Sequence, residues 1–249
     1  MSGHSKWANI KIKKGKVDAQ RGAAFTRLAK EVIAAARAGG GDPTNNLRLR
    51  NAIQKARDAS MPNDNITRSI KRGTGELEGV IYEEVTYEGY GPAGVAIMVD
   101  CLTDNRNRTA PEVRSYFRAS GGNLGETGCV SYLFDHQGII TIAKEEGDED
   151  TIMLAALEAG AQDVQTEEED VYIVLTDPAT VFTVNEELKK AGINTLDAEA
   201  RMVPKVAVTL TGKEAQQVAK LLDKFEENDD VQNVYSNADI ADEDEGAVG

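Results

Sequence analysis

The 249-residue sequence is poor in the residues that most often carry chemistry. Aromatic residues make up 5% of it, and it has two cysteines, two histidines and one tryptophan. Cys101 and Cys129 have neither a second cysteine pair nor a histidine cluster beside them. This pattern argues against a zinc site and gives no reason to expect a disulfide. We expect two buried thiols, no metal and no other cofactor.

Long apolar runs are also missing. No window approaches the roughly 18 consecutive apolar residues of a membrane span. The segment Met1 to Lys6 lacks the apolar core of a secretory signal. We therefore expect no membrane partner and a cytoplasmic location. The hydrophobic content of 41% and the charged content of 28% are otherwise typical of a folded globular protein.

Groups that could act together in catalysis are not apparent. His4 lies near the start, whereas His136 follows Asp135 in an expected turn, which makes a catalytic pair improbable. Gly89 to Gly94 matches the G-x-G-x-x-G dinucleotide pattern, but that pattern requires a helix after the glycines and here a strand is expected. A hairpin loop explains the glycines better. The sequence indicates a protein that is not an enzyme and has no evident small-molecule substrate.

Charge is distributed very unevenly along the chain, whose net charge is -14. Residues 1–72 hold 16 lysines and arginines against 5 aspartates and glutamates, whereas residues 73–249 hold 12 against 37. An acidic protein would normally repel phosphate. A strongly basic part within such a chain instead indicates contact with nucleic acid or a membrane surface.

The most informative basic segment precedes the first expected helix. Residues 7–17 read WANIKIKKGKV, with lysines alternating with apolar residues around a glycine, which is typical of an extended arm. Lysines suit phosphates, and the ring of Trp7 could stack on an exposed base. The alternative is that Trp7 packs on the protein and the lysines only solvate its surface. The candidate nucleic-acid-binding residues of the arm are His4, Lys6, Trp7, Lys11, Lys13, Lys14 and Lys16.

Apolar residues then recur at spacings of three and four, which predicts three short amphipathic helices. The first follows a possible cap at Asp18 and stops at Gly39, the second is centred on residues 49–56, and the third runs from about residue 63 to Gly73. Three such helices form a small bundle. Its arginines could extend the binding surface, although for each one a solvated helix face is an equal alternative. The candidates are Arg21, Arg27, Arg48 and Arg50.

Near residue 76 the spacing of the apolar residues changes from three or four to two, which is typical of strands. This change predicts a second domain, of the α+β class. Strands are expected over residues 82–87 and 95–103, and a helix over 111–120. Between them, the segment Thr103 to Thr109 contains two asparagines with Arg106 and Arg108, residue types that suit base edges and phosphates. The alternative is a loop that caps its own helix and strand.

The remaining elements predict a third, inserted domain. Strands and helices alternate from residue 129 to 203, including strands ending at residue 134 and covering 139–143. A strand, a helix and a strand then return to complete the second domain. We predict a basic arm and bundle over 1–75, a discontinuous domain over 76–128 and 204–238, an insert over 129–203, and an acidic disordered tail over 239–249.

The predicted fold class is therefore α+β and multidomain. A three-helix bundle at the amino terminus is followed by two mixed α+β domains with small antiparallel or mixed sheets. A chain of 249 residues is long enough for several domains, each with a hydrophobic core of its own.

Several motifs, in order along the chain, resemble those of the YebC family. They are Gly3 to Lys11 (GHSKWANIK), Asn46 to Arg50 (NLRLR), Tyr87 to Pro92 (YEGYGP), Thr103 to Thr109 (TDNRNRT) and Asp230 to Tyr235 (DVQNVY). The resemblance covers nearly the whole chain. One departure is Ile12, where many relatives carry histidine.

The resemblance implies a three-domain protein described as a probable transcriptional regulator that binds DNA. It also implies an alternative, because mitochondrial relatives resemble activators of translation and some bacterial members are linked to the ribosome. We therefore expect nucleic acid as the partner, with DNA first and RNA or the ribosome second. An enzyme that uses a cleft between the mixed domains is the weakest alternative.

Overall fold

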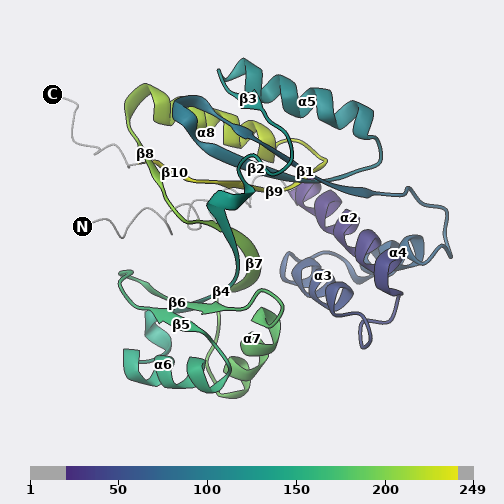
Figure 1. Cartoon of the computed structure of the whole chain (residues 1–249). Coiled ribbons are helices and arrows are strands. Elements are labelled where there is room, and N and C mark those ends of the chain that lie inside the picture. The colour runs from purple at the N-terminus through teal and green to yellow at the C-terminus, as the bar shows by residue number, and fades with distance from the viewer. Residues whose placement is uncertain (1–20, 241–249) are drawn as a thin grey trace. The chain divides into compact units, whose positions relative to one another are not determined.

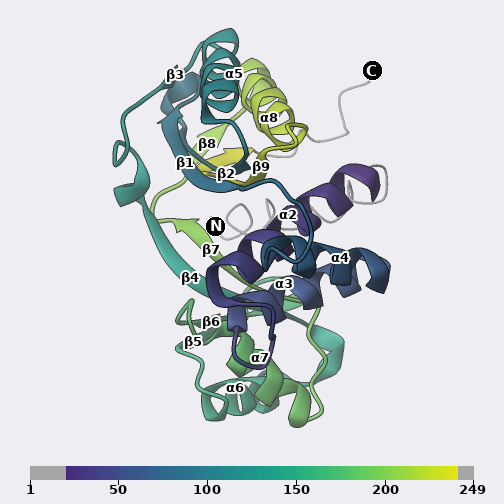
Figure 2. The ribbon, with the colours of Figure 1, turned by 90° about the vertical axis from the view of Figure 1, so that its right-hand side faces the viewer.

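The computed structural model describes residues 21–240, and these form two compact units (Figures 1 and 2). One unit comprises residues 133–207. The other comprises residues 21–132 together with 208–240, so the chain leaves it and returns. Amino-terminal helices precede the sheets, and the predicted α+β fold class is confirmed.

The helical bundle consists of α2 (Arg21–Gly39), α3 (Leu47–Asp58) and α4 (Asn63–Gly73). Asn46 starts α3, because its side-chain oxygen accepts a hydrogen bond from the Leu49 amide at 3.0 Å. The apolar stripes pack together and bury small residues of α3 against α2. The core contains Val32, Ala35, Ala36, Leu49, Ala52, Ile53, Ala56, Met61 and Ile66.

Helix α4 lies close to α2 at Gly73. A Cβ atom there would lie 2.6 Å from the carbonyl oxygen of Ile33 and 2.7 Å from the Cβ of Ala36. Both neighbours belong to the carboxyl-terminal half of α2 and cannot move without disturbing that helix. The absence of a side chain at Gly73 therefore sets the distance between the two helices.

The second part of the same unit is a four-stranded antiparallel sheet. Its order is β3 (Asn123–Leu124), β1 (Glu83–Tyr90), β2 (Ala96–Thr103) and β9 (Val231–Ser236). Strand β9 comes from the far end of the sequence, after the insert. Nearby, β8 (Val208–Leu210) and β10 (Ala238–Ile240) form a parallel pair.

Two helices, α5 (Arg106–Ala119) and α8 (Gly212–Glu226), cover one face of this sheet (Figure 1). Val99 and Cys101 of β2 point into the core beneath them. Phe117 of α5 and Phe225 of α8 are fully buried, with ring centroids 5.0 Å apart. Aromatic rings at this separation add to the stabilisation from apolar burial.

Helix α5 begins five residues earlier than the sequence pattern predicted. Pro111 was expected to open the helix, but it lies inside α5, whose cap is Asn105. The Asn105 side chain accepts a hydrogen bond from the Arg108 amide at 3.2 Å. Four residues of the expected loop, 106–109, are therefore helical, because the asparagine cap outweighs the preference of proline for a first turn.

The unit of residues 133–207 is a second antiparallel sheet covered by helices α6 (Glu149–Glu158) and α7 (Val181–Lys190). Its order is β5 (Asp163–Gln165), β6 (Val171–Thr176), β4 (Phe134–Ala143) and β7 (Asp197–Pro204). The prediction of a turn after residue 134 is wrong, because β4 is continuous and His136 lies within this strand. Gly138 pairs with both neighbouring strands and does not interrupt the ladder.

The described end of the chain also differs from expectation. Asp239 and Ile240 were placed in the disordered tail, but they pair with Thr209 and Leu210 in the small parallel sheet. The rest of that predicted tail, residues 241–249, lies outside the described residues. Within residues 21–240, no helix is long and apolar enough to cross a membrane.

The close approach at Gly73 leads to a prediction. Replacing Gly73 by alanine should destabilise the protein by about 1–3 kcal/mol, because the new methyl group overpacks the contact with α2. Thr67→Ala, at an exposed position of the same helix, should change stability by less than ~0.5 kcal/mol. Urea unfolding of both variants measures the difference. Equal stabilities would contradict the assigned role of Gly73.

Candidate nucleic-acid interface

The bundle is rich in exposed cationic side chains. Helices α3 and α4 and the end of α2 expose eight of them, whereas their exposed acidic residues are few. The exposed cations are Arg37, Arg48, Arg50, Lys55, Arg57, Arg68, Lys71 and Arg72. We call these eight residues the bundle cations.

Helix α3 presents its cations on two sides, because residues seven apart lie on the same side of a helix. Arg48 forms an ion pair with Glu84 of β1, and Lys55 lies 3.4 Å from Glu31 of α2. Both pairs are solvent-exposed, and exposed pairs of this kind contribute little to stability, about 0–1 kcal/mol. A phosphate could therefore displace either carboxylate at small cost.

Arg50 and Arg57 lie on the other side of α3. The Arg50 guanidinium donates hydrogen bonds to the carbonyl oxygens of Pro43 at 3.1 Å and Thr44 at 3.2 Å, which braces the preceding loop. Its charge is not neutralised by these neutral acceptors. Arg57 makes no ion pair within residues 21–240.

Helix α4 supplies a further group of cations. Arg68, Lys71 and Arg72 are separated by three and four residues, so they are neighbours on one side of the helix. None of the three is held by an ion pair in the described part of the chain. The opposite side of α4 packs Ile66 into the bundle core. The helix therefore has one apolar and one cationic side.

Arg27 of α2 differs from the bundle cations because it is half-buried. Its Nε and Nη2 atoms are buried, and neither finds a hydrogen-bond partner among the described residues. A buried, unpaired guanidinium group is costly. An anion at this position would therefore gain more than one at a fully exposed arginine.

A polar cleft of about 240 Å³ lies between α3 and the sheet within this unit. Arg48 and Lys55 line it, together with the carboxylates of Glu31, Glu84 and Asp100. Charges of both signs therefore meet in the cleft, and two of its cations already pair with two of its carboxylates. This balance does not favour an anionic ligand inside it.

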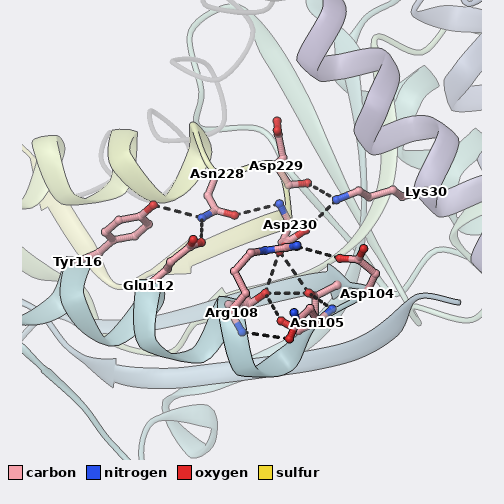
Figure 3. Close-up of polar contacts among 11 residues, drawn as sticks. Lys30, Asp104, Asn105, Arg108, Glu112, Tyr116, Asn228, Asp229 and Asp230 are labelled. Carbon is pink, nitrogen blue, oxygen red and sulfur yellow. Dashed lines mark hydrogen bonds and ion pairs between the residues drawn. The ribbon is translucent and has the colours of Figure 1, made fainter. Parts of the chain in front are cut away.

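Asp230 is the centre of a polar network that includes residues of the segment Thr103 to Thr109, which the sequence analysis singled out for its arginines (Figure 3). The Oδ2 atom of Asp230 accepts hydrogen bonds from Arg108 Nη2 at 2.6 Å, from Thr109 Oγ1 at 2.8 Å and from Thr103 Oγ1 at 3.2 Å. Arg108 also donates to Asp104 at 2.9 Å. Its guanidinium group is thus fixed between two carboxylates.

The same carboxylate reaches the helical bundle. Lys30 of α2 is buried, and its ammonium group lies 2.9 Å from Asp230 Oδ1 and donates to the Asp229 carbonyl oxygen at 2.8 Å. It also lies 5.4 Å from the centre of the Tyr82 ring. Asp230 therefore connects α2, the start of α5 and the turn before β9, three segments that are far apart in sequence.

The charges in this network determine the ionisation of Asp230. Burial by itself would raise the pKa of its carboxyl group, but hydrogen bonds from Lys30, Arg108 and Thr109 outweigh burial and lower that pKa to about 2. Hydrogen bonds to Asp230 and Asp104 likewise raise the pKa of Arg108. Asp230 is thus a fully ionised, buried carboxylate at neutral pH.

The predicted site residues fall into three groups by their location. His4, Lys6, Trp7, Lys11, Lys13, Lys14 and Lys16 lie outside the described residues. Arg21 is the first residue of α2, while Arg27, Arg48 and Arg50 belong to the bundle as expected. Arg106 is exposed and 3.9 Å from Glu83.

Arg108 has a structural role that the sequence pattern did not indicate. Its partner Asp230 is 122 residues away, and no local spacing connects the two. Arg57, Arg68, Lys71 and Arg72 were not among the predicted site residues, although the basic excess of residues 1–72 pointed to all of them.

Comparison with known proteins identifies the family. The model described as the TACO1/YebC protein N-terminal domain matches residues 5–76, and the model of the TACO1/YebC second and third domain matches residues 82–238. The chain belongs to the TACO1/YebC family. The Asp230 network therefore connects the two regions that these models describe.

Relatives in this family are similar over nearly their full length. A protein of Geobacter sulfurreducens is 57% identical over 98% of both chains, and one of Persephonella marina is 56% identical over 97% of both. Both are named probable transcriptional regulatory proteins. The crystal structure of a conserved hypothetical protein from Aquifex aeolicus is 49% identical, with a TM-score of 0.81 over 92% of this chain and 94% of that one.

Asp230 leads to a prediction about stability. Asp230→Asn should lower the free energy of unfolding by about 3–5 kcal/mol, because the buried Lys30 ammonium and the Arg108 guanidinium lose their shared counter-ion. Asp229→Asn is the matched control, since only the backbone oxygen of Asp229 contacts Lys30. Chemical denaturation of both variants measures the difference, and equal stabilities would contradict the role of the carboxylate.

The pH dependence of the same variant provides a second readout. The pKa of Asp230 falls from an ordinary value of 3.8 to about 2 on folding, so its contribution is present above about pH 4 and is lost as the pH falls toward 2. The stability difference between wild type and Asp230→Asn should shrink over this window. A difference that stays constant from pH 5 to about 2 would show that ionisation of Asp230 does not stabilise the fold.

Proposed function

We propose that the protein is a non-enzymatic regulator of gene expression that binds DNA through its basic amino-terminal region. The observation that carries this proposal is the group of bundle cations, several of which have no acidic partner within the described chain. Its relatives are named probable transcriptional regulatory proteins, which agrees with a role in regulation.

The phosphate backbone suits this surface. Lysine and arginine side chains on duplex DNA release condensed counterions, and this provides affinity that does not depend on base sequence. Residues 73–249, with 12 basic and 37 acidic residues, would be repelled by the same phosphates. The acidic part would therefore direct approach so that the bundle meets the DNA.

The described helices favour contact with phosphates over stacking on bases. Helices α2 to α4 contain one aromatic residue, Phe25, which is half-buried against the bundle core. Single-stranded nucleic acid is usually bound by exposed aromatic rings. Duplex DNA is therefore the better match for these helices.

The second candidate is a translation factor that binds RNA or the ribosome. The feature that favours it is Trp7 among the lysines of the arm, because a flat ring suits unpaired bases. Co-sedimentation with ribosomes at low salt tests this candidate directly. Ribosome binding that outcompetes duplex DNA would favour it over DNA regulation.

Removing bundle cations should weaken DNA binding. We expect about five phosphates to be neutralised, giving a slope of log affinity against log salt near -4 to -5. Arg57→Gln, Arg68→Gln and Lys71→Gln together should make this slope shallower by roughly 2–3 units, since each cation that contacts a phosphate contributes about one. Fluorescence anisotropy on a labelled duplex at several salt concentrations measures the slope.

The matched control removes three lysines from the other unit. Lys189→Gln, Lys190→Gln and Lys205→Gln change the net charge by the same amount and lie at exposed positions. We expect their affinity and salt slope to equal those of the wild type. Equal losses in the two triple variants would assign the effect to net charge, and the absence of any binding at low salt would contradict DNA binding altogether.

Arg27 allows a test that separates binding from stability. Arg27→Met keeps an unbranched apolar stem and removes a half-buried charge, two of whose nitrogens are buried and have no partner among the described residues. Stability should stay the same or rise, because removal of an uncompensated buried charge is favourable. DNA affinity should fall by about tenfold if a phosphate pairs with this guanidinium. Lower stability with unchanged affinity would instead assign Arg27 to the fold.

A further inference from the structure

Helix α5 has a charge that is unusual for its part of the chain. Residues 73–249 contain five arginines, and four of them lie in this single 14-residue helix. The helix contains one acidic residue, Glu112, which accepts a hydrogen bond from the Asn228 side chain at 3.1 Å. The concentration of arginine in an otherwise acidic region requires an explanation beyond solubility.

The fold accounts for one of the four arginines. Arg108 is held by Asp104 and Asp230, as described above. Arg106 is exposed, with Glu83 at 3.9 Å, which is the limit of an ion pair. Arg114 and Arg118 are exposed, and their guanidinium groups make neither an ion pair nor a hydrogen bond with any described residue. Three guanidinium groups of α5 are thus available to a partner.

The exposed side of α5 combines these arginines with neutral donors. Val113 and Phe117 face the core, so Asn107, Arg114, Ser115 and Arg118 occupy the outer side. We call Asn107, Arg114, Ser115 and Arg118 the α5 basic face. Arg106, seven residues before Val113 and 3.9 Å from Glu83 of β1, lies at the start of the helix beside this face. Arginine binds phosphate with two parallel hydrogen bonds, and asparagine and serine also contact phosphate oxygens in protein–DNA complexes.

Helix α5 and the helices of the bundle lie on opposite sides of the four-stranded sheet (Figures 1 and 2). Val99 of β2 points into the core under α5 and α8. Asp100, the next residue, points the other way, because side chains alternate along a strand. It lines the cleft with Arg48 and Lys55 of α3. One duplex on the bundle cations therefore cannot also follow the outer side of α5 without bending around the sheet.

We propose that the α5 basic face binds the phosphate backbone of a second nucleic-acid segment, so that one protein chain bridges two segments. This inference rests on the proposed function, because the bundle cations hold the first segment. The acidic excess of residues 73–249 disfavours phosphate over most of this part of the chain. Lys224 of α8, 4.9 Å from the centre of the Tyr116 ring, adds a cation beside α5. The partner is a polyanion with repeated phosphates, and the contact does not depend on base sequence.

A two-colour capture experiment with the full chain tests the bridge. A biotinylated duplex on beads is incubated with protein, and a second, fluorescent duplex of the same length is then added at low salt. We expect the wild type to retain the fluorescent duplex. Arg114→Gln and Arg118→Gln together should abolish its retention, while binding of a single duplex, measured by anisotropy, falls less than in the bundle triple variant.

The controls keep this proposal separate from the function on which it rests. Lys189→Gln, Lys190→Gln and Lys205→Gln should retain the fluorescent duplex as the wild type does, and circular dichroism should show that the α5 variant is folded. Retention by the folded α5 variant would overturn the proposal, because the bridge would then arise elsewhere, for example from association of two chains. Wild-type protein that binds one duplex but retains no second duplex would overturn it while leaving DNA binding intact. Failure to bind any duplex would overturn both.

Discussion

The buried carboxylate of Asp230 is the interaction on which the arrangement of the amino-terminal unit depends. It accepts from Lys30 in the bundle and from Arg108 and Thr109 at the start of α5. A buried ammonium group and a buried carboxylate are costly to desolvate, and here they persist because each has its partners, including the more exposed Arg108. A charge-based contact of this kind fixes orientation more strictly than apolar packing would, and it joins the basic helices to an otherwise acidic structure.

This connection explains how a protein with a net charge of -14 can carry a basic surface. The bundle cations lie on helices whose other sides form a small apolar core, so their charges point outward. Among the bundle cations, Arg48 and Lys55 form ion pairs with Glu84 and Glu31. The cations of α4 form no ion pair with a described residue and remain available to a partner. The acidic remainder limits where phosphates can approach, and α5 provides the exception within it.

Much of this architecture could be predicted from sequence, since periodicity reports which side of an element is buried. Leu49, Ala52, Ile53 and Ala56 indicated the buried side of α3, and the strand predicted over residues 95–103 agrees within one residue with β2. Local signals also misled: Asp135 and His136 suggested a turn where β4 is continuous, and Pro111 suggested a later start of α5. The Asp230 network could not be predicted, because pairing over 122 residues leaves no local pattern.

In the proposed function, phosphates contact the cationic sides of the bundle and not the acidic unit of residues 133–207. Photochemical crosslinking of the full chain to a duplex that contains a photoreactive base, followed by mass spectrometry of the crosslinked peptides, tests it most directly. The account predicts that most crosslinks fall in peptides from the amino-terminal 75 residues, with a smaller group from α5 at higher DNA concentration. Crosslinks mainly in peptides from residues 133–207 would contradict it.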